Sequence, residues 1–272
     1  MNKIFLRDAG VIKEKTNKKY FNKLEFFLRL DNAIYLSKKK SIRVQITINK
    51  NFFLENIQSF NKKIKELSSL KAITIHLHAY YNSLINKQKE TIEFVNLLNK
   101  FSSSLKNVRG YCIHPDNVKN YLFLQKLKIK KRYVAIEVTD LKSRSGNNVL
   151  EIRNILKNNK FLDLVLDSSH IEQIREKFPK ELTIFQYFKE FKNKVVEIQI
   201  SSNKNLYEKN IFTKNFKTDH SLLSLSNKKI FNDLMKIHGL KKINLTIEGV
   251  VPFNDYGFSL LNKEINLLNK LK

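Results

Sequence analysis

The feature that most constrains the fold is an alternation of short β-branched segments with longer stretches of helical periodicity. The strand-like runs are Ser41–Thr47, Ala72–His76, Val108–His114, Arg132–Val138, Leu162–Asp167, Val195–Ile200 and Ile243–Glu248. Amphipathic stretches separate them and end the chain, at Phe52–Leu67, Lys87–Leu105, Val118–Leu127, Val149–Lys157, Glu181–Phe191, Ile230–His238 and Leu260–Leu271. This alternation implies a parallel sheet with right-handed crossovers.

Eight such units in 272 residues match a closed (β/α)8 TIM barrel, an α/β fold. The eighth strand precedes residue 41, and both Lys3–Arg7 and Leu24–Leu30 qualify. An open doubly wound sheet is the alternative, but no Gly-rich phosphate-binding turn follows the first strand. No linker or break in composition interrupts residues 1–272, so we expect one domain. Residues 201–226 are the longest irregular stretch, which we expect to form a loop over the active face.

The formal net charge of +26 has two interpretations. It can attract phosphates, either of nucleic acid or of a phosphorylated sugar. It can also reflect AT-rich codons, because Lys, Asn and Ile are abundant while the chain has no Trp and only 6 Gly. The lysines are scattered rather than gathered with aromatic residues in one motif. Nucleic acid therefore stays open as a partner beside a small-molecule substrate.

Other bulk features predict a cytoplasmic protein without a membrane segment. No apolar run approaches the ~20 residues that a membrane helix needs. The first residues lack the apolar core and cleavage site of a signal peptide. The one cysteine, Cys112, lies in an apolar run, and we expect a buried, unreactive thiol.

Polar side chains end six successive predicted strands. These strands read ITIHLH, GYCIH, VAIE, LVLD, VVEIQI and LTIE, and they supply His76, His78, His114, Glu137, Asp167, Gln199 and Glu248. In a parallel barrel, alternate residues point inward and functional groups gather at the carboxyl ends of the strands. The residues before the last four ends, Ile136, Leu166, Ile198 and Ile247, would face the helices.

A buried carboxylate is costly unless it is paired or bound to a metal. Three carboxylates converging on one rim therefore predict a divalent-metal site made of Glu137, Asp167, Gln199 and Glu248. Such ligands suit Mn²⁺, Mg²⁺, Co²⁺ or Zn²⁺. Two glutamates beside the metal can move a proton at a carbon next to a polarised carbonyl, as in an isomerase or epimerase. A rim richer in histidine would instead hold two or three zinc ions and activate water against a phosphodiester.

The ordered series resembles the xylose-isomerase-like barrel superfamily. This superfamily includes sugar isomerases and epimerases, hydroxypyruvate isomerase and the endonuclease IV type of abasic-site nuclease. The resemblance covers about residues 42–260 and depends on the order of IHLHAYY, CIHPDN, AIEVTD, VLDSSH, EIQISS, KTDHS and TIEGVVP.

The resemblance implies roles for individual residues. Glu137 and Glu248 are similar to the family's paired metal ligands and acid/base groups, and Asp167 and Gln199 are similar to the remaining ligands. His170 corresponds to the substrate or second-metal histidine of an Asp-x-x-His motif. The predicted substrate-binding residues are His76, His78, His114, Lys142, Arg144 and His220. At the positions of His76 or His78 and of His114, nuclease members place zinc ligands.

Departures from the nuclease pattern decide between the hypotheses. Gln199 stands where nuclease members carry His, which weighs against a trinuclear zinc site. The leading hypothesis is a metal-dependent isomerase or epimerase of a small sugar, sugar phosphate or keto-acid. The alternatives are a zinc-dependent abasic-site nuclease and a barrel that binds a ligand without catalysis.

Overall fold

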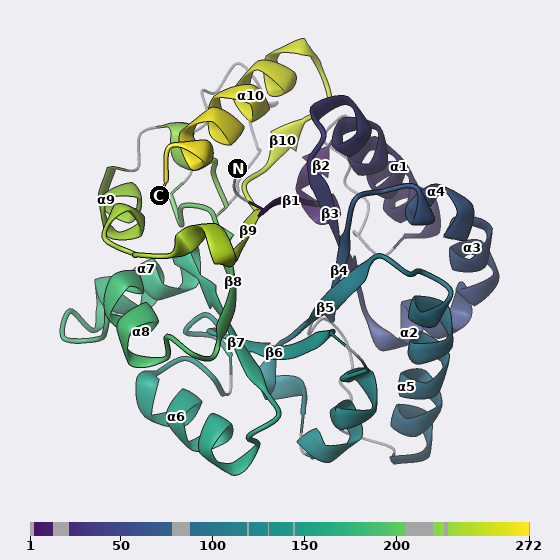
Figure 1. The fold of residues 1–272 in the computed structure, drawn as a ribbon, viewed down its shortest axis with the longest axis horizontal. Coiled ribbons are helices and arrows are strands. Elements are labelled where there is room, and N and C mark those ends of the chain that lie inside the picture. Colours follow the sequence, from purple (N-terminus) through teal and green to yellow (C-terminus); the bar gives the residue numbers. More distant parts are fainter. Residues whose placement is uncertain are drawn as a thin grey trace.

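Eight parallel strands close into a barrel in the described part of the chain (Figure 1). The structure is a computed structural model, and it describes residues 3–12, 22–77, 88–118, 120–129, 131–143, 145–204, 220–225 and 228–271. The strands, in barrel order, are β1 (Lys3–Arg7), β3 (Arg43–Ile48), β4 (Ile73–Leu77), β5 (Val108–Ile113), β6 (Tyr133–Glu137), β7 (Asp163–Asp167), β8 (Val195–Ile200) and β9 (Asn244–Ile247). The predicted (β/α)8 barrel is therefore confirmed.

The first strand is β1, which pairs in parallel with both β3 and β9 and so closes the barrel. The other candidate, Leu24–Leu30, lies within the helix α1 (Lys23–Lys40). The Asn22 side chain caps this helix by accepting hydrogen bonds from the backbone N–H groups of Leu24 and Glu25. Leu24 and Leu28 are exposed while Phe26 and Leu30 are buried, which is helical spacing rather than the alternation of a strand.

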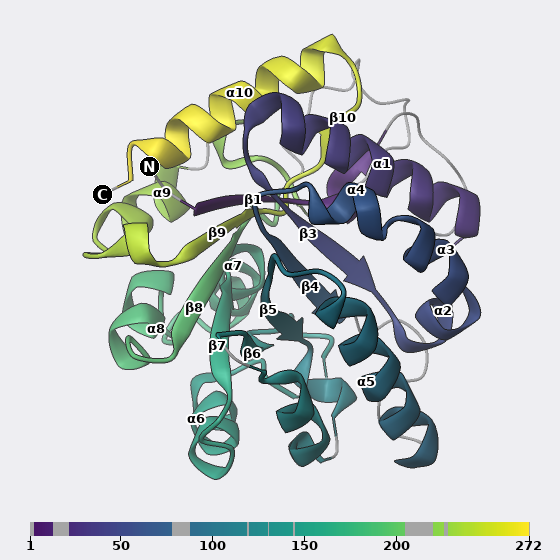
Figure 2. The same cartoon turned by 45° about the vertical axis from the view of Figure 1, so that its right-hand side comes forward.

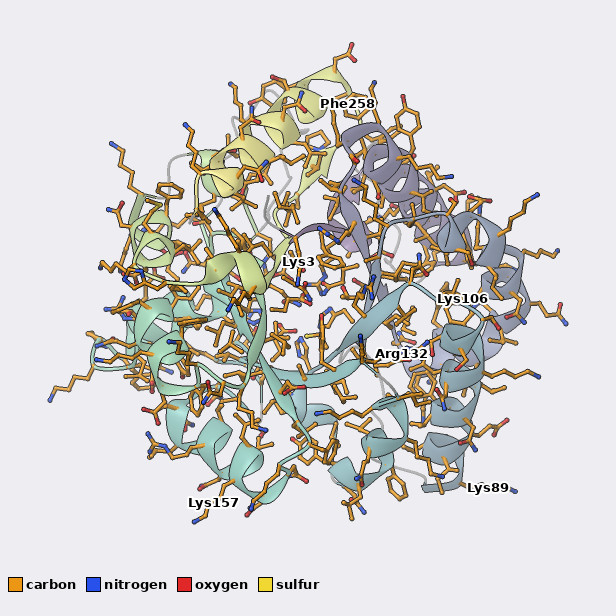
Figure 3. The ribbon with its side chains drawn as sticks, viewed as in Figure 1. Lys3, Lys89, Lys106, Arg132, Lys157 and Phe258 are labelled. Atoms are coloured by element: carbon orange, nitrogen blue, oxygen red, sulfur yellow. The ribbon has the colours of Figure 1, made fainter. Side chains whose placement is uncertain are left out.

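Helices surround the barrel, as Figure 2 shows. Beyond α1 they are α2 (Lys50–Glu55), α3 (Ile57–Lys62), α4 (Ile64–Ser68), α5 (Gln88–Ser103), α6 (Val149–Asn158), α7 (Ser168–Lys177), α8 (Ile184–Glu190), α9 (Lys228–Met235) and α10 (Asp255–Asn269). The helix α10 lies beside α1 and completes the ring, with Phe258 (labelled in Figure 3) 5.3 Å from Lys39 Nζ. None of the helices in the described segments is long and apolar enough to cross a membrane.

Two predicted helices differ from the structure. The stretch Phe52–Leu67 lies in three short helices, because helical geometry is interrupted twice. The first break is at Asn56, whose side-chain amide donates to the Phe52 carbonyl, and the second is at Lys63. The stretch Val118–Leu127 contains a 3₁₀ helix at Tyr121–Leu127, which begins where the Asn120 side chain accepts from the N–H of Leu122. Neither change affects the order of the strands.

The strands present different side chains to their two faces. Ile136, Leu166, Ile198 and Ile247 are fully buried in the large apolar core between strands and helices, as predicted. Inside the barrel lies a small apolar cluster of Cys112, Ala135 and Val165. The alternation of each strand therefore directs the residues of the predicted site toward the barrel axis.

A short second sheet extends beyond the barrel. The strand β2 (Val11–Ile12) pairs in parallel with β10 (Val251–Pro252), so the segments that follow β1 and β9 remain side by side. Between β9 and β10, Gly249 lies against the backbone of Leu222, and a Cβ atom at residue 249 would be 2.7 Å from the Leu222 nitrogen. This close approach holds residues 220–225 next to Glu248.

Candidate active site

The four predicted metal ligands lie at the carboxyl ends of consecutive strands. Glu137 ends β6, Asp167 ends β7, Gln199 is the penultimate residue of β8, and Glu248 directly follows β9. Asp167 pairs with Gln199 across the sheet, and Gln199 pairs with Thr246. All four side chains are buried. The structure thus brings these residues to one end of the barrel.

Glu137 lies at the centre of a group of three histidines. Its Oε2 is 2.8 Å from His76 Nε2, and its Oε1 is 3.4 Å from both His114 Nε2 and His170 Nδ1. The Cys112 thiol also donates to Oε2 at 3.1 Å. Burial opposes ionisation of this carboxyl, but the neighbouring His114 and His76 hold its pKa well below the usual range. Glu137 is therefore an ionised carboxylate in a buried site.

Asp167 and His170 are brought together by the first turn of α7, a helix that begins directly after β7. Asp167 caps this helix, because its Oδ1 accepts from the N–H groups of Ser169 and His170. Its other oxygen, Oδ2, is 3.3 Å from His170 Nδ1, and this nitrogen is 3.0 Å from the Val138 carbonyl. Burial lowers the pKa of His170, but Asp167 and Glu137 outweigh it and raise the pKa to about 9.

His220 approaches the same end of the barrel from the loop before α9. Its Nδ1 is 3.0 Å from Ser201 Oγ, 3.2 Å from Ser169 Oγ and 3.8 Å from Glu248 Oε2. The His220 carbonyl accepts from the N–H of Val250. Most of the predicted loop 201–226 lies outside the described residues, but this anchored end lies beside the site.

Arg7, at the end of β1, is a site residue that the sequence analysis missed. Its guanidinium forms an ion pair with Glu248 Oε1. It also contacts His76 Nδ1 at 2.6 Å and donates to Thr47 Oγ1 at 3.2 Å. The sequence held a signal for it, since IFLR ends on a polar residue as the other strands do. Arg7 was not predicted as a site residue, because the sequence alone left two candidates for the first strand.

Two more shifted pKa values accompany Arg7. Burial and the charge of Arg7 lower the pKa of His76 to about 3, so this histidine is neutral. Burial raises the pKa of the adjacent Asp8 to about 6, although its carboxylate accepts from the N–H of Thr47. The region around β1 therefore combines a buried cation, a neutral imidazole and a destabilised carboxylate.

Glu197 is a second missed residue, located on the inner face of β8 two positions before Gln199. It is fully buried and accepts from Gln45 Nε2 at 2.6 Å, Thr246 Oγ1 at 2.7 Å and Tyr133 Oη at 2.5 Å. Because a carboxylate only accepts, it turns the amide nitrogen of Gln45 toward itself and leaves the Gln45 oxygen for Gln199 Nε2, 3.5 Å away. This chain of contacts turns Gln199 Oε1 away from the Gln45 amide.

Several buried groups in the site have the chemistry to hold a metal ion. Two sets of ligand atoms lie within 4.8 Å of one another, namely His76, His114 and Glu137, and Glu137, Asp167 and His170. Within the described residues, one oxygen of each predicted ligand has no hydrogen-bond partner: Glu137 Oε1, Asp167 Oδ2, Gln199 Oε1 and Glu248 Oε2. Histidine nitrogens lie 3.4 Å from Glu137 Oε1, 3.3 Å from Asp167 Oδ2 and 3.8 Å from Glu248 Oε2, without forming a hydrogen bond of good geometry. Buried oxygens that lack hydrogen bonds are costly, and a cation would compensate them.

The remaining predicted substrate-binding residues include one member of this cluster, one loop residue and two residues outside the described chain. His114 is buried, with Nδ1 3.9 Å from Asp116 Oδ1. Lys142 is exposed on the loop after β6, where its backbone N–H donates to Asp140. His78 and Arg144 fall outside the described residues.

Comparison with known proteins identifies the fold. No family model matches the chain, and no curated protein does. A solved structure of a putative sugar phosphate isomerase/epimerase from Anabaena variabilis is similar over 100% of both chains, with a TM-score of 0.65 and 13% identity. The probable 3-DHS dehydratase of Bacillus anthracis matches over 98% of both chains, with a TM-score of 0.59 and 13% identity.

A xylose isomerase domain protein from Planctomyces limnophilus is similar over 99% of this chain and 96% of its own, with a TM-score of 0.56 and 9% identity. These matches cover the whole barrel at low identity. The chain is therefore a (β/α)8 barrel with a buried carboxylate–histidine cluster at the carboxyl ends of its strands. Its fold is that of the xylose-isomerase-like barrels, as the sequence resemblance predicted.

Proposed function

We propose that this protein is a divalent-metal-dependent isomerase or epimerase acting on a small sugar, sugar phosphate or keto-acid. The observation that supports it most is that all four predicted ligands keep one buried oxygen without a hydrogen-bond partner in the described part of the chain. Three carboxylates and one amide oxygen form a hard donor set suited to Mg²⁺, Mn²⁺, Co²⁺ or Zn²⁺. Glu137, Asp167, Gln199 and Glu248 would hold the ion.

The metal would supply polarisation of a substrate carbonyl, which acidifies the neighbouring C–H. Glu137 is ionised, because its pKa lies well below the usual range, and the family resemblance assigns it as the acceptor of that proton. Glu248, held by Arg7 at one oxygen, is the second carboxylate and can exchange a proton at the other face of the reacting carbon. Without a bound metal, Asp167 and Glu137 raise the pKa of His170 to about 9. The imidazole lies beside the proposed ligands and can bind a substrate oxygen that gains negative charge.

The polar character of the site supports a small oxygenated substrate. Histidine and serine side chains surround the carboxylates, and they offer hydrogen bonds to hydroxyl groups. Exposed Lys142, on the loop after the strand that carries Glu137, could bind a phosphate or carboxylate of that substrate, together with Arg144. The Anabaena neighbour is itself described as a putative sugar phosphate isomerase/epimerase.

A zinc-dependent abasic-site nuclease is the second candidate, and one observation favours it. His76, His114 and Glu137 place three ligand atoms close enough to hold an additional ion. Gln199 weighs against this candidate, as does the distribution of cations. The lysines are scattered along the sequence, and Lys89 and Lys157, for example, lie on different helices, α5 and α6 (Figure 3).

The metal claim is tested by metal analysis of the purified protein beside the double variant Glu137→Gln/Glu248→Gln. We expect one ion per chain in the wild type and none in the double variant. Glu25→Gln is a matched control, because Glu25 is a buried glutamate on α1 that pairs with Arg29 rather than with a histidine of the site. Equal metal content in all three proteins would contradict the proposal.

The choice between isomerase and nuclease requires a separate assay. We expect no cleavage of a DNA duplex that contains an abasic site. Cleavage that is sensitive to a chelator and lost in His114→Ala would instead establish the nuclease. Metal bound without turnover of any sugar, sugar phosphate or keto-acid would favour a ligand-binding barrel.

A further inference from the structure

We propose that Arg7 fixes the proton of His76 on Nε2 and thereby restricts the metal centre to one ion. The inference rests on the proposed function for the metal, but its first step concerns only two side chains of this chain. Arg7 lies at the end of β1 and is 5% exposed. From there it spans the strand ends on either side, contacting Thr47 on β3, His76 on β4 and Glu248 after β9.

The chemistry of arginine determines what these partners can be. A guanidinium is always charged, and it carries N–H donors but no acceptor. Thr47 Oγ1 and Glu248 Oε1 both accept hydrogen bonds readily. The Nδ1 atom of His76, 2.6 Å from Arg7 Nη2, must therefore present a lone pair rather than a hydrogen.

This requirement selects one form of the His76 ring. A neutral imidazole has a single N–H, so the hydrogen lies on Nε2 when Nδ1 accepts. That nitrogen is 2.8 Å from Glu137 Oε2, an oxygen that can only accept when ionised. The opposite tautomer would place N–H against N–H at Arg7 and lone pair against lone pair at Glu137. Both contacts are compatible only with the Nε2–H form.

A histidine that binds a metal needs a lone pair on the coordinating nitrogen. In His76, Arg7 occupies Nδ1 and the hydrogen occupies Nε2, so neither nitrogen is available. The set of His76, His114 and Glu137 then lacks one of its three ligands. The positive charge of Arg7 beside it also repels a second dication.

Arg7 leaves the proposed ligands of the first ion in place. It pairs with Glu248 through Oε1, whereas Oε2 has no hydrogen bond within the described residues. Within the described residues, no hydrogen bond or ion pair joins the guanidinium to Glu137, Asp167 or Gln199. One arginine thus orients Glu248 for the ion and removes His76 as a ligand. We therefore assign Arg7 as a positioning residue that sets the number of metals.

The tautomer can be measured directly by long-range ¹H–¹⁵N NMR on metal-free protein labelled in histidine. The signal of His76 is identified by its loss in His76→Gln. We expect an unprotonated Nδ1 and a protonated Nε2 at neutral pH. A proton on Nδ1, with or without one on Nε2, would overturn the inference, whatever the protein binds.

The consequence is measured as zinc per chain after equilibration and desalting. We expect one ion in the wild type, two in Arg7→Met and one again in Arg7→Met/His76→Gln. Arg153→Met is the control and should retain one, because Arg153 on α6 pairs with Glu190 on α8. Two ions in the wild type, or one in a folded Arg7→Met, would overturn the inference.

No zinc in the wild type would instead contradict the proposed function and the one-ion limit together. The NMR result would still decide whether Arg7 sets the tautomer of His76. If Arg7→Met does not fold, the NMR measurement on the wild type still tests whether Nδ1 of His76 is unprotonated.

Discussion

Two glutamates on the inner faces of β6 and β8 show what separates a functional carboxylate from a structural one in this barrel. Glu137, at the end of β6, lies among histidines and keeps one oxygen without a hydrogen bond in the described chain. Glu197, deeper on β8, accepts hydrogen bonds from three neutral donors. The histidines lower the pKa of Glu137, whereas burial raises that of Glu197. Burial alone therefore does not identify a ligand; an unsatisfied oxygen beside cationic or metal-binding groups does.

The largest effect is expected from removing the charge of Glu137. Glu137→Gln should lower turnover by about 10³-fold, because it removes both a metal ligand and a proton acceptor. Its effect on folding should be small, since the amide retains the shape of the side chain. Steady-state kinetics and circular dichroism measure the two effects. A Glu137→Gln variant with wild-type turnover would contradict the assignment of Glu137 as the functional glutamate and Glu197 as the structural one.

The connection between the two regions is tested at Gln45, which donates to Glu197 and faces Gln199. Gln45→Leu should weaken metal affinity by about 10- to 100-fold, as expected when a residue that orients a ligand is lost. Calorimetric titration with Mn²⁺ gives the affinity. Unchanged affinity would show that Gln199 is oriented by other contacts or does not bind the ion.

Asp8 extends the comparison, because its buried carboxyl has a pKa raised to about 6 from 3.8. Between about pH 4 and 6 the folded state retains a proton that the unfolded state releases, so the free energy of unfolding falls as pH rises. The loss amounts to about 3 kcal/mol at about 1.4 kcal/mol per pKa unit. The Asp8→Asn variant should not show this fall in the free energy of unfolding. Denaturant unfolding of both proteins from pH 4 to 7 measures the difference, and parallel curves would contradict the assignment.

The smallest effect on activity is expected at Glu197. Glu197→Gln should reduce turnover by less than about tenfold and leave metal content unchanged. Because the folded-state pKa of Glu197 is raised, its contribution to stability is present in acid and is lost as pH rises. The variant should therefore gain stability relative to the wild type between acidic and neutral pH. A loss of bound metal equal to that of Glu137→Gln would place Glu197 in the functional site.

The sequence predicted the barrel and its rim because both depend on local periodicity. Alternation within each strand was enough to direct Glu137, Asp167 and Gln199 inward and Ile136 outward. Arg7 was missed because two segments qualified as the first strand, and they are distinguished by the pairing of β1 with β3 and β9 and by the helical burial of α1. Glu197 was missed because it lies before the end of its strand, whereas functional residues were predicted only at strand ends. Its hydrogen-bond partners also come from three other strands. Such contacts between distant strands leave no local pattern.

The helix α7 is a second case in which a contact of the site leaves no local sequence pattern. The Asp-x-x-His spacing pointed to Asp167 and His170, but it did not show that Asp167 also caps the helix that carries the histidine. That dual contact depends on where the strand ends. The roles of His78 and Arg144 remain predictions, since both lie outside the described residues.

The most direct test is a titration of divalent metal into the matched pair Glu137→Gln and Glu197→Gln beside the wild type. Each variant removes one charge from a buried glutamate inside the same barrel, and they differ only in which glutamate is changed. We expect the wild type and Glu197→Gln to bind one ion per chain, and Glu137→Gln to bind none at the same concentrations. Equal binding by the two variants would contradict the account of the site.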